Sequence, residues 1–184
     1  MKNVNKKFTE TNIRVNCRFS YMHVFTPRPA DPNTPGSKPK YDCCIVIPKS
    51  DEQAVKLVRE AEEAAKKLYA EKHGKPKSKL KSVVYDGDEE RPDDEVVAGC
   101  IFINTSSPRQ PGVKMLEGGM LVDALDEEDV YSGCYGAADI NFFPYSAPTA
   151  NGIGCGLNNI LKLEDGDRLG GGSRNADAAF ADLV

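Results

Sequence analysis

The second half of the chain concentrates aromatic side chains in one segment. Five of them lie within fifteen residues: Tyr131, Tyr135, Phe142, Phe143 and Tyr145. Because side chains alternate between the two faces of a strand, Phe142 shares a face with the apolar Ala138 and Ile140. Phe143 and Tyr145 then point to the opposite face. Flat rings on the solvent side of a sheet form a platform on which unpaired bases can stack.

Rings and basic groups together build a surface that stacks bases and holds phosphates. The candidate rings are Tyr41, Tyr131, Tyr135, Phe143 and Tyr145. For each ring the alternative is an ordinary core position, which is our interpretation of Phe19, Phe102 and Phe142. The candidate phosphate-binding groups are Arg14, Arg18, Lys38, Lys40, Lys77, Lys79, Lys81 and Arg109. Their alternative is a solvated surface without a ligand.

The charge of the chain is strongly polarised. The net charge is −4, but residues 1–81 carry 18 Lys and Arg against 9 Asp and Glu. Residues 82–184 carry 6 against 19. Phosphate binding depends on the local field and not on the total charge. A polyanionic ligand is therefore compatible with the sequence, provided that basic groups of the first half meet the rings of the second.

The acidic segment over residues 86–95, DGDEERPDDE, is the candidate for a divalent-metal site. Its carboxylates lack the spacing of a calcium-binding loop, and no matching base or histidine accompanies them. We therefore expect a solvated or electrostatically steering loop and no bound metal.

The cysteines and histidines offer little chemistry. The six cysteines are Cys17, Cys43, Cys44, Cys100, Cys134 and Cys155. They form no C-x-x-C pair, and most lie in apolar segments, which predicts buried free thiols in a reducing compartment. His23 and His73 are expected on an inward strand face and at a helix end, so neither activates a nucleophile. The sequence predicts no catalytic residue and no cofactor.

Gly152, Gly154 and Gly156 match part of a phosphate-binding fingerprint. That fingerprint requires a helix after the glycines, whereas NNILKL reads as a strand. We expect these glycines to serve a turn, a bulge or a barrel corner.

Strands are predicted over 12–25, 40–47, 96–104 and 119–125 from alternation and apolar runs. In the first of these, the inward face includes Tyr21, His23 and Phe25. Ser50 and Gln53 form a capping-box pair, and an apolar stripe follows that predicts a helix ending near Gly74. Strands with one helix and no βαβ alternation predict a mainly β fold, an OB-fold-like antiparallel barrel with an inserted α-helix.

The 184 residues suffice for one domain with a real core. We expect that domain over 1–169 and a flexible, weakly acidic tail over 170–184. The first residues, MKNVNKKF, lack an apolar signal region, and the longest apolar run, over 43–47, is too short to cross a bilayer. The sequence therefore predicts a cytoplasmic protein without membrane contact.

Several segments over residues 12–172 form a recognisable set: RFSYMHVFTP, PKYDCCIVIPKSD, the helix, DGDEERPDDE, IFINTSS, YSGCYGAADINFFPYS and GIGCGLNNILKLEDGDRLGG. Together they resemble the single-stranded DNA-binding proteins of tailed bacteriophages, a family long described as of unknown function. The resemblance implies an OB-fold and a non-enzymatic role in phage DNA replication and recombination, with little sequence preference, in the cytoplasm of the bacterial host. Related proteins often end in an acidic, aromatic tail that contacts replication partners. Here the tail is only weakly acidic and Phe180 is not terminal.

The predicted function is to coat transient single-stranded DNA by base stacking and phosphate contacts. The predicted partners are single-stranded DNA and phage or host replication proteins, and a homodimer is left open. The tail residues that would contact replication proteins are Asp177, Phe180 and Asp182. One alternative is a protein-interaction or virion-assembly module that works through the acidic surface without binding DNA. A metal-dependent nuclease is the third hypothesis for the function.

Overall fold

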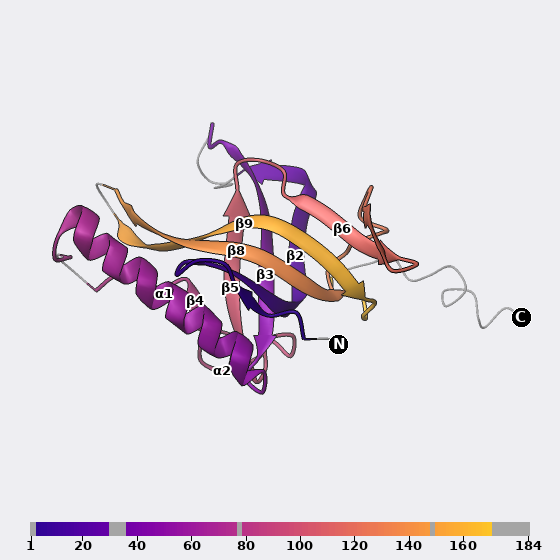
Figure 1. Ribbon diagram of the computed structural model, residues 1–184, viewed down its shortest axis with the longest axis horizontal. Helices are drawn as coiled ribbons and strands as arrows, with labels where there is room; N and C mark the ends of the chain where they lie inside the picture. Colours follow the sequence, from indigo (N-terminus) through magenta and orange to yellow (C-terminus); the bar gives the residue numbers. More distant parts are fainter. Residues whose placement is uncertain (1–2, 30–35, 77–78, 148–149, 171–184) are drawn as a thin grey trace, which may run out of the picture.

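A single sheet curls into a barrel in the computed structural model, which describes residues 3–29, 36–76, 79–147 and 150–170 (Figure 1). Its strands are β1 (Lys6–Lys7), β2 (Asn12–Pro29), β3 (Pro39–Pro48), β4 (Val84–Asp86), β5 (Cys100–Ser107), β6 (Gly112–Glu117), β7 (Met120–Asp123), β8 (Tyr135–Ser146) and β9 (Asn151–Glu164). The helices are α1 (Glu52–His73) and the short α2 (Gly87–Glu90).

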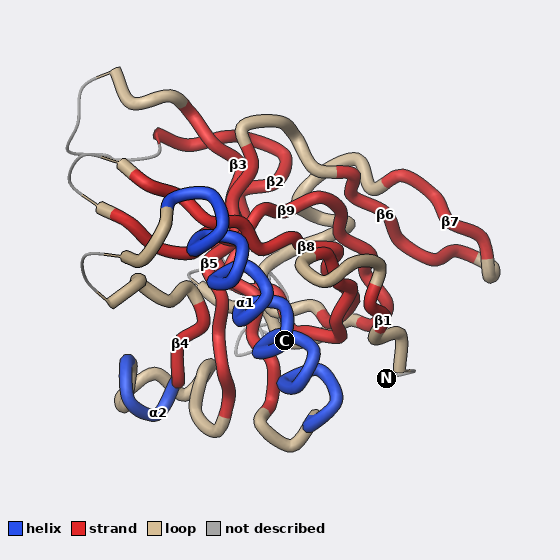
Figure 2. Tube along the Cα trace, turned by 60° about the vertical axis from the view of Figure 1, so that its left-hand side comes forward, coloured by secondary structure: helices blue, strands red, loops and turns tan. Residues whose placement is uncertain are grey.

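Five strands close the barrel. In the order β5, β3, β2, β8, β9, neighbouring strands are antiparallel, and a parallel pairing of Ser106 with Gly156 joins β9 back to β5. This is the strand order of an OB-fold, with β3 and β5 as its second and third strands. The fold predicted from the sequence is confirmed, and the inserted helix α1 lies between these two strands in the chain. The β6–β7 hairpin projects from the barrel (Figure 2).

Inward-facing side chains fill the barrel. The largest of them include Phe19, Ile45, Ile103, Ile140 and Phe142. Helix α1 packs against β8 and β2 and adds Val58 and Ala61 to the same core. Its buried face also holds Glu62, whose carboxylate accepts hydrogen bonds from the Ser82 hydroxyl and the Val83 N–H. These bonds compensate the cost of burying a carboxylate and tie the helix to the segment that leads into β4.

The helix N-terminus differs by one residue from the prediction. Asp51, not Ser50, is the N-cap, and its carboxylate accepts a hydrogen bond of 3.0 Å from the Ala54 N–H. A charged cap also interacts favourably with the positive end of the helix dipole. The predicted end is confirmed, because Gly74 caps the helix with a φ of 75°.

Strand β2 changes face at Tyr21, so the prediction that Tyr21 and His23 point inward is wrong. The pairing with β3 shifts register between Ser20 and His23, and Tyr21 has a φ of 48°. A bulge inserts one residue and thereby reverses the alternation that follows it. Val24 becomes the buried residue, while Tyr21 is exposed to solvent.

The apolar stretch over 96–104 is only partly a strand, because β5 begins at Cys100. Val97 lies in the preceding turn and is buried against the outward-facing Val46 and Phe102. The segment is apolar because it covers the outer face of β3 and β5, which alternation along a single strand does not reveal.

The cysteines are free thiols, and all but Cys100 are buried, as the sequence predicts. Burial raises the pKa of the Cys44 thiol to about 11, so it stays protonated at neutral pH. Within the described ranges, no group of three or more His, Cys, Asp or Glu side chains is arranged to hold a metal ion. Neither described helix has the length and apolar character needed to span a membrane.

Candidate nucleic-acid interface

An open pocket of about 420 Å³ lies on the outer face of β2, β3 and β5. Its lining includes Tyr21, Arg28, Asp42, Arg91, Asn104 and Ser106. In OB-folds, oligonucleotides bind on the outer face of the second and third strands, between the loop that joins the first two strands and the loop that joins the last two. The pocket therefore occupies the face on which a nucleic acid is expected.

An exposed ring and a cation are held together at this pocket. Tyr21 is 58% exposed, and the Arg91 guanidinium carbon lies 5.7 Å from the centre of its ring. The same guanidinium lies 4.5 Å from the centre of the Phe102 ring, which stacks on Tyr85 at 5.1 Å. The buried Phe102 ring, stacked on the partly buried Tyr85, thus holds Arg91 by cation–π attraction beside Tyr21.

Neither Tyr21 nor Arg91 was among the predicted site residues. Alternation predicts Tyr21 on the inward face, because the bulge that exposes it leaves no mark in the sequence pattern. Arg91 belongs to the acidic segment 86–95, which the sequence predicts to be a solvated or steering loop. Arg91 is the only basic residue within residues 86–95, and this isolated position is the signal that would have identified it.

The carboxylate in the pocket is neutralised locally. The Arg28 Nε donates to Asp42 Oδ2 at 2.7 Å, and His23 Nδ1 lies 2.9 Å from Asp42 Oδ1. Lys40 is exposed and lies opposite Arg28 in the β2–β3 register. This edge of the pocket is therefore basic on balance, with the exposed Lys38 just before β3.

The β8–β9 hairpin carries two further rings. A Cβ at Gly154 would lie 2.6 Å from Phe143 Cζ, and one at Gly152 would lie 2.9 Å from the Tyr145 hydroxyl oxygen. Both glycines are inside β9, opposite Phe143 and Tyr145 in register, so neither serves a turn or a bulge. Bare backbone here leaves room for rings to lie over the strand. Phe143 remains 41% exposed.

These rings lie on the same face as the pocket. Ser106, which lines the pocket, pairs with Gly156 of β9. A Cβ at Gly156 would lie 2.6 Å from the side-chain oxygen of Asn141, so Asn141 covers that position on the outer face. Because side chains alternate, Phe143 and its partner Gly154, two residues further along, lie on the same face. The pocket and the hairpin rings thus form one continuous surface, here called the stacking face.

Basic groups flank the stacking face as the charge polarity requires. Lys81 forms a bridge with Gly152, and a Cβ at that glycine would lie 3.0 Å from the Lys81 Cβ and 2.9 Å from the Tyr145 hydroxyl oxygen. Lys79 is exposed nearby in the same segment, and Arg109 is exposed in the turn after β5. Lys77 lies outside the described residues, as do the tail residues Asp177, Phe180 and Asp182.

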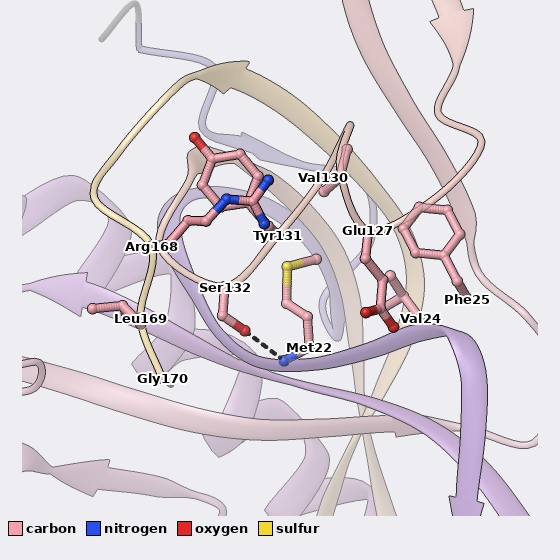
Figure 3. A pocket seen from close by; sticks show the side chains of 10 residues that line it. All are labelled: Met22, Val24, Phe25, Glu127, Val130, Tyr131, Ser132, Arg168, Leu169 and Gly170. Atoms are coloured by element: carbon pink, nitrogen blue, oxygen red, sulfur yellow. Dashed lines mark hydrogen bonds between the residues drawn. The ribbon is translucent and has the colours of Figure 1, made fainter. Parts of the chain in front are cut away.

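Tyr131 is engaged inside the protein. Figure 3 shows it at a second pocket, of about 280 Å³, with Arg168 packed against its ring. The Arg168 guanidinium carbon lies 4.1 Å from the ring centre, and Lys162 Nζ lies 4.9 Å from it. The hydroxyl donates to Asp165 Oδ1 at 2.9 Å. The structure does not bring this ring to the stacking face.

Tyr135 is also half-buried, and it packs against Arg18. The Arg18 guanidinium carbon lies 5.2 Å from the centre of the Tyr135 ring, and Arg18 donates to the carbonyl oxygens of Gly133 and Asp167. Tyr135 begins β8, eight residues from Phe143 or about 26 Å along an extended strand. Tyr41 is half-buried near the start of β3.

Comparison with known proteins places the chain in a family. The model of a family described as "Enterobacter phage Enc34, ssDNA-binding protein" matches residues 11–183. The chain belongs to this family. No curated protein matches the chain at a significant level.

Solved structures agree with the Enc34 family in fold. The chain is 26% identical to the single-stranded DNA-binding protein from bacteriophage Enc34 in complex with ssDNA, covering 92% of this chain and 99% of that one with a TM-score of 0.74. A second structure of the Enc34 protein gives 24% identity, 98% and 99% coverage and a TM-score of 0.71. The single-stranded DNA-binding protein gp2.5 of bacteriophage T7 shares the fold at 12% identity, with 86% and 98% coverage and a TM-score of 0.56.

Proposed function

We propose that this protein binds single-stranded DNA with little sequence preference on the stacking face and supports phage DNA replication and recombination without being an enzyme. The observation that carries the proposal is that the exposed rings of Tyr21 and Phe143, with the half-buried Tyr145, lie on the outer face of an OB barrel. The Enc34 relative, solved in complex with ssDNA, supports the same ligand. A protein with this role works in the cytoplasm of the infected cell.

Binding would combine two contributions. Bases would stack on the exposed rings, each stacked base contributing about 1–3 kcal/mol by the alanine-substitution measure. Phosphates would pair with Arg28, Lys40 and Lys81, which border the rings and release counterions when a strand binds. Every base has a π-face and every nucleotide a phosphate, so these contacts accept any sequence.

Some carboxylates of the acidic segment pair with a lysine, and others are exposed and would repel phosphates. Lys49 Nζ lies 2.7 Å from both Asp86 Oδ1 and Asp88 Oδ2, which raises the Lys49 pKa to about 12. Asp93 and Glu95 are exposed in a shallow pocket beside Tyr21. Their charges would keep a polyanion on the basic side of Tyr21, which makes electrostatic steering the role we propose for this segment.

Fluorescence anisotropy tests the proposal with labelled oligo-dT, RNA of the same length and duplex DNA across a salt series. We expect tight binding to oligo-dT, and an affinity that falls linearly in log–log salt with a slope of about −0.7 per phosphate neutralised. The double variant Tyr21→Ala/Phe143→Ala should bind weakly, whereas Leu125→Ala, at a side chain 81% exposed outside the stacking face, should bind normally. Equal affinity for the duplex, or no binding, would overturn the proposal.

A protein-interaction role is the second candidate, and one observation favours it. The β6–β7 hairpin and the turn after it expose four large aliphatic side chains: Leu116, Met120, Leu121 and Leu125. Aliphatic side chains offer no face to stacked bases, and exposed apolar patches often mark protein contacts. Sedimentation velocity of wild type and Met120→Ser/Leu121→Ser tests whether this surface forms a homodimer. Replication proteins remain the proposed partners of the tail.

A further inference from the structure

A further exposed aromatic ring lies outside the stacking face. Phe8 is 45% exposed in the turn between β1 and β2. Lys6 Nζ lies 5.2 Å from the centre of its ring, and the Arg14 guanidinium carbon lies 5.9 Å from it. The Phe8 N–H donates to the Asn12 carbonyl oxygen at 2.9 Å, which fixes the turn. An exposed ring with two cations close to it has the composition of a nucleotide contact.

Strand register places this ring in line with the hairpin rings. Lys6 lies opposite Arg14, whose side chain points away from the core because the neighbouring Ile13 is buried. Asn12, which anchors the Phe8 turn, lies opposite Asn141 of β8. From Asn141 the outer face continues two residues along β8, or about 7 Å, to Phe143.

The surface between Phe8 and Phe143 is polar and rich in amides. Two carboxylates border this band among the described residues. Glu10, in the Phe8 turn, pairs with Lys7 at 2.9 Å. Asp139 accepts hydrogen bonds from the side-chain amides of Asn12, Asn158 and Asn159 at 3.0, 3.1 and 2.8 Å. Asp139 also lies opposite Arg14 in register. Amide donors and an adjacent arginine offset its charge, so the band does not oppose the passage of a phosphate chain.

We propose that Phe8, with Lys6 and Arg14, is an additional stacking site for the single-stranded DNA that leaves the stacking face at Phe143. The inference rests on the proposed function and extends it, because it lengthens the track that one molecule covers. A base would stack on the exposed side of Phe8, and its flanking phosphates would pair with Lys6 and Arg14. Short oligonucleotides would fill the stacking face alone, and longer ones would reach Phe8.

Affinity measured against oligonucleotide length tests the inference. Wild type, Phe8→Ala and Phe143→Ala are compared on oligo-dT from about 6 to about 30 nucleotides, a range that spans the site sizes of OB-folds. Phe8→Ala should bind the shortest ligands normally and the longest about 5- to 150-fold more weakly. Lys6→Gln should reduce the log–log salt slope by about 0.7, on long ligands only.

Controls separate the possible outcomes. Phe8→Leu keeps apolar cover but removes the π-face, so it should reproduce the length-dependent loss if stacking is the cause. Unchanged binding of Phe8→Ala at every length, or an equal loss at every length, would overturn the additional site. If Phe143→Ala still weakens all lengths, the proposed function survives that result. If wild type binds no oligo-dT at all, the proposed function itself fails.

Discussion

Replacing Phe143 by alanine separates a stacking ring from a structural one. Burying a whole Phe side chain contributes about 1.5–3 kcal/mol. Phe143 is 41% exposed, and its remaining surface covers the bare backbone at Gly154. Phe143→Ala should therefore lower the free energy of unfolding by about 1–2 kcal/mol. A domain stable by about 5–15 kcal/mol stays folded after such a loss.

The expected loss of affinity is larger than this change in stability can explain. One stacked base contributes about 1–3 kcal/mol, which corresponds to about 5- to 150-fold in Kd. Unfolding of a small fraction of the protein changes the apparent Kd by much less than twofold. A Phe143→Leu variant keeps much of the apolar cover over Gly154 but has no π-face. It should resemble wild type in stability and the alanine variant in affinity.

Two measurements on the same samples decide the matter. Anisotropy with labelled oligo-dT at one salt concentration gives Kd, and denaturant unfolding gives the free energy of unfolding. Leu125→Ala serves as the control for loss of an exposed apolar side chain. The reasoning is refuted if Phe143→Ala binds as wild type does, or if Phe143→Leu has full affinity. A base needs an aromatic ring to stack on, whereas any apolar side chain can cover the backbone at Gly154.

Four further outcomes follow from the geometry. Gly154→Ala should weaken binding as Phe143→Ala does, since its Cβ would lie 2.6 Å from Phe143 Cζ and must displace the ring; anisotropy checks this. Lys81→Gln should reduce the magnitude of the log–log salt slope by about 0.7. Asp51→Ala should lower the free energy of unfolding by about 1 kcal/mol, whereas Ser50→Ala should change it little, because Asp51 is the cap. The hydrogen bond from Lys49 is the main cause of the lowered pKa of the Asp86 carboxyl. At Asp88 the main cause of the lowered pKa is the hydrogen bond from the Gly99 N–H, and the one from Lys49 comes second. The stability that these two carboxylates contribute is present above the ordinary carboxyl pKa of about 4 and is lost as pH falls through their lowered pKa values. The free energy of unfolding of Lys49→Met should therefore depend less on pH in that window, as denaturant unfolding at several pH values would show.

Local patterns predicted those features that depend on neighbouring residues alone. Alternation in the second half assigned Ile140 and Phe142 to the core and Phe143 to the outer face, and both assignments are confirmed. The end of the helix at Gly74 was predicted from the glycine and the apolar stripe. The barrel followed from the order of strands and helix together with turn signals. Each of these inferences uses interactions within one element or between sequence neighbours.

The features that escaped prediction depend on contacts between distant segments. A bulge in β2 exposes Tyr21, and only the pairing with β3 reveals it. Arg91 is held in place by its contact with the Phe102 ring, which belongs to β5. Tyr131 and Tyr135 resemble Phe143 in sequence, yet the fold leaves both rings only partly exposed and packs each against an arginine from elsewhere in the chain.

The sequence by itself determined the materials of the interface: rings concentrated in the second half, cations in the first, and an alternation that sends some rings outward. Only the tertiary structure decided which rings meet which cations. Closure of the barrel through the Ser106–Gly156 pairing brings β5 beside β9, so that Phe143 and Tyr145 share a face with Tyr21 and the basic edge of β3. The physical reason is that stacking and phosphate binding are properties of a surface, and a surface built from strands far apart in the chain exists only after those strands pair.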